Sequence, residues 1–296
     1  MSNAKYLIFS RQYDAQSAQT YSRLVQILGQ EGITPLVWGQ LYDGMLAAGF
    51  PEVERTERFE SDSVDADVVL SVGGDGTFLA AGKLVMGTQI PVLGINRGRL
   101  GFLSDVAPEH LQEAMHDVLA GNYRIIELPV LSLYDKEGRE PIGFAINEIA
   151  VSKCDGLSML NIDADVDGDF LTSYWADGLI LATATGSTAY SLSVGGPIVS
   201  PSLGSLILSP VAPHNLTIRP LLLPDSVVVT LRVDGRGGHF MAAVDGQTFV
   251  MKTGTWLRIA RSRMTVRRIQ LNSYSFFETI RDKLMWGADL RNNSSK

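Results

Sequence analysis

Two glycine-rich segments carry most of the chemistry that this sequence suggests. The first, residues 71–77, reads Ser-Val-Gly-Gly-Asp-Gly-Thr and directly follows the apolar residues 68–70. This order predicts a buried strand, a tight glycine turn and a helix that begins near Thr77. Because glycine leaves no side chain between backbone N–H groups and a ligand, such N–H groups at the start of a helix can bind phosphate.

Asp75 lies inside this predicted phosphate loop, where a carboxylate repels phosphate. We therefore expect Asp75 to hold a cation or to accept a proton from a hydroxyl group, two tasks that belong to phosphoryl transfer. The alternative is an ordinary tight turn in which Asp75 or Thr77 caps a helix. The loop has neither the Gly-Lys-Ser/Thr ending of a Walker A motif nor the Gly-x-Gly-x-x-Gly of a dinucleotide fingerprint.

The second segment, residues 177–198, joins an apolar strand at 179–182 to a run of small hydroxylated residues. Residues 186–190 are expected to begin a helix, with N–H and hydroxyl groups at its mouth. Tyr190 could stack on a base or ring, and Asp177 could accept a hydrogen bond from an exocyclic amine or a ribose hydroxyl. The alternative is an N-capped helix on an ordinary turn.

Three shorter motifs are weaker when each is taken alone. Residues 147–148, Asn-Glu, end an expected strand and suit a ribose diol or a magnesium ion, although a solvated strand end is favoured for this pair. Residues 96–103 follow another strand, and their two arginines could meet phosphate or could lie on a charged surface turn. Residues 245–247, Asp-Gly-Gln, predict a hairpin turn.

Several other sites are excluded. The series Asp163-x-Asp165-x-Asp167-Gly resembles the start of a calcium loop, but Tyr174 stands where a bidentate Glu is required, so the segment predicts a strand and a hairpin turn. The four histidines lack zinc-ligand spacing, and no Gly-x-Ser-x-Gly elbow occurs. The late arginines, at positions 258, 261, 263, 267 and 268, are expected on a solvated face or an interface.

The composition suits a globular protein of two ordinary domains, because the chain has 296 residues of which 45% are hydrophobic. Its net charge of −7 argues against a general nucleic-acid binder, which needs a basic face. The single cysteine, Cys154, allows no intrachain disulfide and suits a reducing cytosol. Since no signal-peptide pattern and no run of 18 apolar residues occurs, we expect a cytoplasmic protein without a membrane span.

Up to residue 123, strand-like and helix-like segments alternate. Short apolar runs are found at 6–9, 33–38, 68–72 and 90–95, with helical patterns between them and a polar loop expected over 51–65. The alternation predicts a doubly wound α/β domain with a parallel sheet. The Gly-Gly-Asp-Gly turn then lies at the carboxyl end of a strand, where such sheets bind ligands.

From residue 124 onward, strand-like runs follow one another and predict a mostly β domain over 124–272. The runs cover 124–134, 142–151, 159–166, 169–175, 179–183, 226–233, 239–244 and 256–261. The tail from Ser275 to Trp286 has a helical pattern again. We expect this helix to return to the N-terminal domain, so that residues 273–296 complete residues 1–123.

Together these motifs resemble the NAD kinase family of the bacterial type, and they occur in the family's order across most of the chain. They are Gly73-Gly74-Asp75-Gly76-Thr77, Ile95-Asn96-Arg97-Gly98, Leu100-Gly101-Phe102-Leu103, Asn147-Glu148, Asp177-Gly178-Leu179-Ile180, Thr185-Gly186-Ser187-Thr188-Ala189-Tyr190-Ser191-Leu192-Ser193, Gly195-Gly196-Pro197-Ile198 and Asp245-Gly246-Gln247. The first motif is shared with diacylglycerol and sphingosine kinases and with 6-phosphofructokinases. Its combination with Thr-Gly-Ser-Thr-Ala-Tyr is more specific.

The resemblance implies transfer of the ATP γ-phosphoryl group to the adenosine-ribose 2′-hydroxyl of NAD, with Mg²⁺ carried by ATP. Asp75 would be the general base or would orient the hydroxyl, next to the phosphate loop of Gly73, Gly74 and Thr77. The substrate-binding residues that the resemblance implies are Gly76, Asn147, Glu148, Asp177, Thr188, Ala189, Tyr190, Ser191, Leu192, Ser193, Ala212 and Gln247. A homodimer or homotetramer is also implied, with the NAD site bordering a subunit interface.

Two positions depart from the family pattern. Trp175 stands where many relatives carry a basic residue, which leaves open how the NAD phosphates are neutralised. Ala184 replaces a common proline, which costs loop rigidity. Two other functions use the same features: a lipid or sugar kinase with the Gly-Gly-Asp-Gly loop, or a nucleotide-binding regulatory module without turnover, in which we would expect the carboxylate of Asp75 to be lost.

Overall fold

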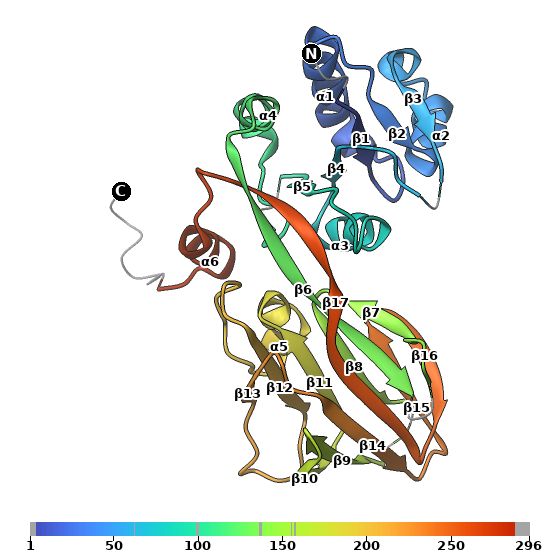
Figure 1. Ribbon diagram of the computed structural model, residues 1–296, viewed down its shortest axis with the longest axis vertical. Helices are drawn as coiled ribbons and strands as arrows, with labels where there is room; N and C mark the ends of the chain where they lie inside the picture. Colours follow the sequence, from blue (N-terminus) through green and yellow to red (C-terminus); the bar gives the residue numbers. More distant parts are fainter. Residues whose placement is uncertain are drawn as a thin grey trace. The chain divides into compact units, whose positions relative to one another are not determined.

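The computed structural model of the chain describes residues 4–61, 63–98, 101–135, 138–154, 156 and 158–287 (Figure 1). The chain divides into two compact units. Unit 1 consists of Met1–Glu127 and Val266–Lys296, and unit 2 consists of Leu128–Thr265. The chain leaves unit 1 within strand β6 (Tyr123–Asp135) and re-enters it within strand β17 (Thr255–Leu271).

Unit 1 is built on a parallel sheet with the strand order β17–β5–β4–β1–β2–β3, drawn mainly in blue to teal in Figure 1. The strands in addition to the end of β17 are β1 (Tyr6–Phe9), β2 (Leu36–Trp38), β3 (Glu57–Phe59), β4 (Val68–Val72) and β5 (Val92–Ile95). The loop predicted over 51–65 is wrong in part, because it contains the short helix η2 (Pro51–Arg55) and β3. Although polar, β3 forms because it pairs with β2, with Leu36 opposite Glu57.

Helices cover both faces of this sheet. Besides η2, the helices of unit 1 are η1 (Ala15–Ser17), α1 (Ala18–Gln30), α2 (Gly39–Ala47), α3 (Asp75–Leu84), η3 (Pro108–His110), α4 (Leu111–Ala120) and α6 (Phe276–Leu284). Alternate strand residues such as Ile8 and Leu70 share one core with α1 and α4. The intervening residues Leu7 and Val69 are fully buried as well, and α3 contacts β4 and β5. The predicted α/β fold of this part is confirmed.

Unit 2 is mostly β and contains two antiparallel sheets. One has the order β10–β9–β14–β17, with β6 pairing with β17 and β7, and the other has the order β13–β12–β11–β8–β15–β16. The strands are β7 (Gly143–Ala145), β8 (Glu148–Lys153), β9 (Leu160–Val166), β10 (Asp169–Ala176), β11 (Gly178–Thr183), β12 (Ser205–Val211), β13 (Leu221–Pro224), β14 (Val229–Gly235), β15 (His239–Val244) and β16 (Gln247–Lys252). Both sheets contribute to one core, with Ile162 and Leu257 from the first and Leu181 and Phe240 from the second.

Several predicted strands change in detail. The run expected at 142–151 is two strands, β7 and β8, and the run at 256–261 is the first part of the much longer β17. Strands β12, β13 and β16 were not predicted, because their sequences lack a clear alternation. The calcium-like segment is β9 and β10 joined by a hairpin turn, in which Asp167 and Gly168 both have positive φ.

One prediction about the late arginines is wrong. Arg268 is only 3% exposed and forms an ion pair of 2.8 Å with Asp105, while its guanidinium group lies over the ring of Tyr274. Burial of an arginine is tolerated here because a carboxylate and an aromatic face partner it. Among the described residues, no helix combines the length and the apolar character needed to cross a membrane.

Candidate functional site

Asp75 begins helix α3 at the carboxyl end of the buried strand β4. Between them Gly73 has a φ of 156°, and a Cβ atom there would lie 2.3 Å from the Oγ1 atom of Thr77, so the turn requires glycine. The helix begins two residues before the predicted start at Thr77. A carboxylate in the first turn is favourable, because it faces the positive end of the helix dipole.

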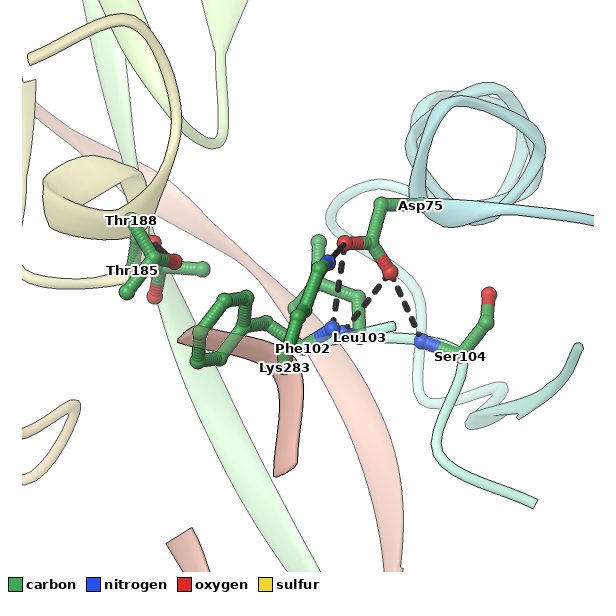
Figure 2. Close-up of polar contacts among 7 residues, drawn as sticks. All are labelled: Asp75, Phe102, Leu103, Ser104, Thr185, Thr188 and Lys283. Atoms are coloured by element: carbon green, nitrogen blue, oxygen red, sulfur yellow. Dashed lines mark hydrogen bonds and ion pairs between the residues drawn. The ribbon is translucent and has the colours of Figure 1, made fainter. Parts of the chain in front are cut away.

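The Asp75 carboxylate is surrounded by donors from two other parts of unit 1. Its Oδ1 atom accepts the backbone N–H groups of Leu103 and Ser104, each at 3.0 Å, and its Oδ2 atom accepts that of Phe102 at 3.0 Å. The ammonium group of Lys283, in the last turn of α6, lies 3.1 Å from Oδ2. Figure 2 shows these four nitrogens converging on the carboxylate.

The 101–104 loop approaches Asp75 this closely because Gly101 has no side chain. A Cβ atom at Gly101 would lie 2.2 Å from the Oδ1 atom of Asp75 and 2.9 Å from the carbonyl oxygen of Ser104. The predicted loop 96–103 is thus shaped by its glycine, and its function in the structure is to bind the carboxylate. Arg99 and Leu100 of this motif lie outside the described residues.

Asp75 is ionised at neutral pH. Burial alone raises the pKa of its carboxyl group, but the charge of Lys283 and the three backbone N–H groups outweigh burial, so the pKa lies below its ordinary value. A base works best when its pKa is near the working pH. Because its pKa is lowered, Asp75 is a weak base. Its environment therefore suits the orientation of a hydroxyl group better than the removal of that group's proton.

Two arginines lie near the glycine-rich turn. Arg11, which follows β1, donates from its Nη2 atom to the carbonyl oxygen of Gly76 at 2.9 Å. Arg97 forms an ion pair of 2.9 Å with Asp14. Arg11 was missed in the sequence, although its position just after a strand that neighbours β4 in a parallel sheet could have identified it.

A cavity of about 550 Å³ in unit 1 has the wrong charge for phosphate. It is lined by Asn96, Asp105 and several further acidic side chains, which are Glu109, Glu113, Asp117, Glu278 and Asp282. Since these carboxylates repel anions, the phosphate site is expected at the glycine-rich turn and not in this cavity.

In unit 2, Asp245 repeats the construction found at Asp75. It lies in the predicted hairpin turn between β15 and β16, and its carboxylate accepts the backbone N–H groups of Ile146, Asn147 and Glu148 at 2.7, 2.9 and 3.2 Å. These bonds end β7 and start β8, which explains why the single predicted strand is broken. The sequence did not reveal this role, because the two segments are almost one hundred residues apart.

Glu148 has an unusual charge state. Burial and, to a lesser extent, the nearby charge of Asp245 outweigh the backbone N–H of Tyr190 and raise the pKa of its carboxyl group to about 7. The Oε2 atom is buried and has no hydrogen-bond partner among the described residues. The Oε2 atom is therefore the acceptor that remains for a hydroxyl group of a ligand.

The pKa of Glu148 predicts a pH dependence of stability. The pKa of Glu148 in the folded protein is above the ordinary 4.5. The contribution of this group to the free energy of unfolding is therefore fully present below pH 4.5 and is lost as the pH rises through about 7. The loss is at most about 3 kcal/mol. We expect Glu148→Gln to remove this component, measured as hydrogen-exchange protection of β8 and β11 amides between pH 5 and pH 8. An unchanged slope in the variant would contradict the assignment.

The hydroxyl-rich segment packs against Asn147. Thr183, at the end of β11, donates to the carbonyl oxygen of Ile146 at 2.7 Å and accepts the N–H of Gly186 at 3.1 Å. A Cβ atom at Gly186 would lie 2.2 Å from the carbonyl oxygen of Asn147. The helix predicted from residue 186 is instead a 3-10 turn, η4 (Thr185–Thr188), followed by the single turn α5 (Tyr190–Ser193).

Several predicted binding hydroxyls in this segment are bonded within the protein. Ser191 pairs with Ser209 at 3.0 Å, and Ser193 donates to the carbonyl oxygen of Tyr190 at 2.8 Å. Thr188 donates to Thr185 at 3.4 Å, and both side chains are drawn in Figure 2. Ala189 and Leu192 are only partly buried, and the Tyr190 side chain is 43% exposed, so its ring is open to stacking.

The predicted residues of unit 2 fall into two groups at opposite ends of β11. Glu148 pairs with Ala182 near the end of that strand, beside the hairpin that leads to Gln247. Asp177 precedes the strand and forms an ion pair of 2.7 Å with Lys153. The exposed Ala212, with a φ of 45°, follows the paired Val211. The six residues of β11 separate the groups by about 17 Å.

The two departures from the family pattern have different surroundings. Trp175 is 59% exposed on β10, an edge strand, two residues before Asp177. Ala184 is 1% exposed and packs in a small core with Ile180 and Ile207. The substitution at 184 is therefore accommodated by burial, and the one at 175 places an aromatic ring on the surface.

Comparison with known proteins agrees with the fold and the motifs. The sequence matches the family profiles for the ATP-NAD kinase N-terminal domain over residues 6–123 and for the ATP-NAD kinase C-terminal domain over residues 146–271. It is 41% identical to an NAD kinase of Bacteroides fragilis, over 97% of this chain and 99% of the relative. It is 38% identical to an NAD kinase of Flavobacterium psychrophilum, over 97% of this chain and 100% of the relative.

Solved structures show the same fold. A yeast NADH kinase complexed with NADH aligns with a TM-score of 0.86 and 24% identity, covering 98% of this chain and 89% of that chain. An NAD kinase from Archaeoglobus fulgidus in complex with ATP aligns with a TM-score of 0.73 and 24% identity, covering 94% and 98%. With both profiles matched and relatives around 40% identical over nearly the whole length, this chain belongs to the ATP-NAD kinase family.

Proposed function

We propose that Asp75 contacts the adenosine-ribose 2′-hydroxyl of NAD when this ATP-NAD kinase transfers the γ-phosphoryl group of ATP to NAD, and that the protein acts in the cytoplasm. The observation that carries the proposal is the ionised Asp75 at the carboxyl end of β4, next to a glycine turn at a helix start. A carboxylate in this place can orient a hydroxyl group toward a phosphate bound by the turn.

The phosphate groups of ATP are assigned to the start of α3. The backbone N–H groups at a helix start lack carbonyl partners one turn earlier and face an anion favourably. Gly74 leaves room for a phosphate to approach, because a Cβ there would meet no atom within 4 Å, while Gly73 provides the positive φ of the turn. Thr77 closes the turn, and Arg11 adds a positive charge beside Gly76.

Mg²⁺ is assigned to the bound ATP. Among the described residues, no three acidic, histidine or cysteine side chains are grouped so that they could hold a metal ion. The donor set fits an ion that binds mainly to substrate phosphates and keeps several waters, as Mg²⁺ commonly does. When bound, the ion neutralises charge on the phosphates during transfer.

NAD binding is assigned to unit 2. The unpaired Oε2 atom of Glu148 and the buried Oδ1 atom of Asn147, which also lacks a partner among the described residues, suit the two hydroxyl groups of a ribose. The exposed ring of Tyr190 suits stacking on a base or on nicotinamide. Thr188, Ala189, Ser191, Leu192, Ser193 and Gln247 of the same unit are assigned to the surroundings of the bound substrate. Gly76 of unit 1 is assigned to substrate binding beside Asp75.

The test is direct. Purified protein is incubated with ATP, Mg²⁺ and NAD, and NADP is measured with an NADP-specific dehydrogenase. NADH, a diacylglycerol and a sugar phosphate serve as alternative acceptors, with ADP release as the common readout. NADP formation supports the proposal. Phosphorylation of the lipid or sugar alone would establish the rival kinase, and NAD binding without turnover would favour the regulatory module.

We also propose a homodimer or homotetramer, with Asp177 and Ala212 at the subunit interface. The distance of about 17 Å between the two groups along β11 leaves Asp177 far from Glu148, and the edge strand β10 exposes Phe170 and Trp175. We expect light scattering to give at least twice the chain mass of 32.2 kDa and Trp175→Glu to lower it toward the monomer. A wild-type monomer at micromolar concentration would contradict the assembly.

A further inference from the structure

We propose that Lys283 is a positioning residue for Asp75, whose ammonium group occupies the place on the carboxylate that the acceptor hydroxyl takes when substrate binds. The inference deepens the proposed function and rests on its contact between Asp75 and the 2′-hydroxyl. It concerns only unit 1, because Asp75, the 101–104 loop and α6 all belong to that unit.

The Asp75 carboxylate is saturated with hydrogen bonds. A carboxylate has about four lone-pair positions. At Asp75 the Oδ1 atom accepts two backbone N–H groups, and the Oδ2 atom accepts one backbone N–H and the ammonium group of Lys283. All four positions are therefore filled, and a hydroxyl group can donate to Asp75 only if one of these donors leaves.

The backbone donors are held in place by the packing of their loop. The N–H of Gly101 donates to the carbonyl oxygen of Ser104 at 2.9 Å, which closes the loop on itself. The loop also lies directly on β5, because a Cβ atom at Gly94 would be only 2.2 Å from the carbonyl oxygen of Leu103. Displacement of an N–H donor would disturb both contacts.

Lys283 is the donor that can move. Its side chain is 32% exposed and consists of a flexible four-carbon stem at the end of a helix that begins with a capping serine, Ser275. Its ammonium group also lies 4.5 Å from the centre of the Phe102 ring, so it has a second favourable contact close to the first. A change of rotamer frees the Oδ2 atom without moving the backbone.

The other charged groups nearby do not replace Lys283. Asp105 interacts electrostatically with Asp75, but its carboxylate is paired with the buried Arg268. Arg11 is bonded to the carbonyl oxygen of Gly76. In the free protein, Lys283 therefore supplies the cation that balances the Asp75 carboxylate, and it competes with the acceptor hydroxyl for Oδ2.

The experiment measures NAD binding without ATP, so that turnover plays no part. Isothermal titration gives the Kd of NAD and of its analogue that lacks the adenosine-ribose 2′-hydroxyl. The ratio of the Kd of the analogue to the Kd of NAD reports the contribution of the hydroxyl group alone. The general attraction between a lysine and the anionic dinucleotide cancels in this ratio. The proteins are wild type, Lys283→Met, Lys283→Arg and the control Arg281→Met, which removes the same charge from the same helix.

We expect Lys283→Met to raise this ratio by about two- to fivefold, the contribution of a partly exposed ion pair. Lys283→Arg and Arg281→Met should keep the wild-type ratio, because the first retains a competing cation and the second never touches Asp75. A ratio that stays constant or falls in Lys283→Met overturns the inference. If Lys283→Met does not fold, Lys283→Ala gives the same test.

Asp75→Asn separates this inference from the proposed function. If the ratio in Asp75→Asn falls to about one while Lys283→Met leaves it unchanged, Asp75 binds the hydroxyl and only the displacement of Lys283 is wrong. If Asp75→Asn keeps the wild-type ratio, the hydroxyl group does not contact Asp75, and the proposed contact is overturned together with the role of Lys283.

Discussion

Asp75→Asn is expected to lower the rate of NADP formation by about 10²-fold or more, because a misplacement of the reacting hydroxyl by about 1 Å already costs about 10²-fold. Asp75 carries the only charged side chain in residues 71–77, and its negative charge attracts the proton of the acceptor hydroxyl. Its amide replacement carries no charge and can accept with one oxygen only. The Km values for ATP and NAD should change much less than kcat.

The same substitution also affects stability, which the measurement must separate from chemistry. The amide NH₂ group faces either the N–H of Phe102 with Lys283, or the N–H groups of Leu103 and Ser104, and in both orientations donors face donors. A buried donor left without an acceptor costs about 1–3 kcal/mol. Rates should therefore be compared well below the Tm of the variant.

Asp167→Asn is a suitable control for Asp75→Asn. The carboxylate of Asp167 also accepts a backbone N–H, from Val228 at 2.8 Å, but it lies in the turn between β9 and β10 and has no assigned part in the reaction. The Asp167→Asn substitution should lower the Tm with little change in kcat. The assignment of Asp75 fails if folded Asp75→Asn keeps its rate within tenfold of the wild type.

Gly186→Ala is expected to destabilise unit 2 by about 3 kcal/mol, the upper end of the usual cost of overpacking, because the atoms that the new Cβ meets cannot yield easily. The added Cβ would lie 2.2, 2.6 and 2.9 Å from the carbonyl oxygen, carbonyl carbon and Cα of Asn147. All three are backbone atoms between β7 and β8, held by the bonds to Asp245. A shift of Asn147 also moves Glu148, so NAD binding should weaken as well.

Hydrogen exchange of the β8 and β11 amides measures this loss locally, which avoids treating the two units as one cooperative transition. Gly29→Ala is the matched control. Gly29 lies within α1, and a Cβ there would meet no atom within 4 Å, so alanine should stabilise unit 1 by about 0.4–1 kcal/mol. Unaltered protection of β8 in Gly186→Ala would show that the segment relaxes more easily than the contacts suggest.

The glycine-rich turn and the parallel sheet could be predicted because their signals are local. A buried run that ends in two glycines defines both a strand end and a site, and residues 68–77 contain the whole pattern. The start of α3 was predicted two residues late, because Asp75 and Gly76 are weak helix formers whose placement in the first turn is favoured by the helix dipole.

The rest of the site depends on partners far apart in sequence. Asp245 was predicted as a turn residue, which is correct, but its bonds to residues 146–148 form only when β15 pairs with β8. Arg268 was predicted on a solvated face or an interface, because nothing local shows that Asp105 and Tyr274 will enclose it. Lys283 is an ordinary basic residue in the last turn of a helix. Its contact with Asp75 becomes visible only in the structure, where α6 belongs to the same unit as Asp75.

The contact between Asp75 and Lys283 spans 208 residues, and this has a consequence for synthesis on the ribosome. Chains emerge at about 5–20 residues per second, so the phosphate turn waits about 10–40 s before its lysine has been made. The strand that pairs with the edge of β5, through Arg268 opposite Val92, is equally late. A nascent chain that stops short of α6 therefore has the glycine-rich motif without the cation that balances its carboxylate, and this part of the site is completed only after Lys283 has been made.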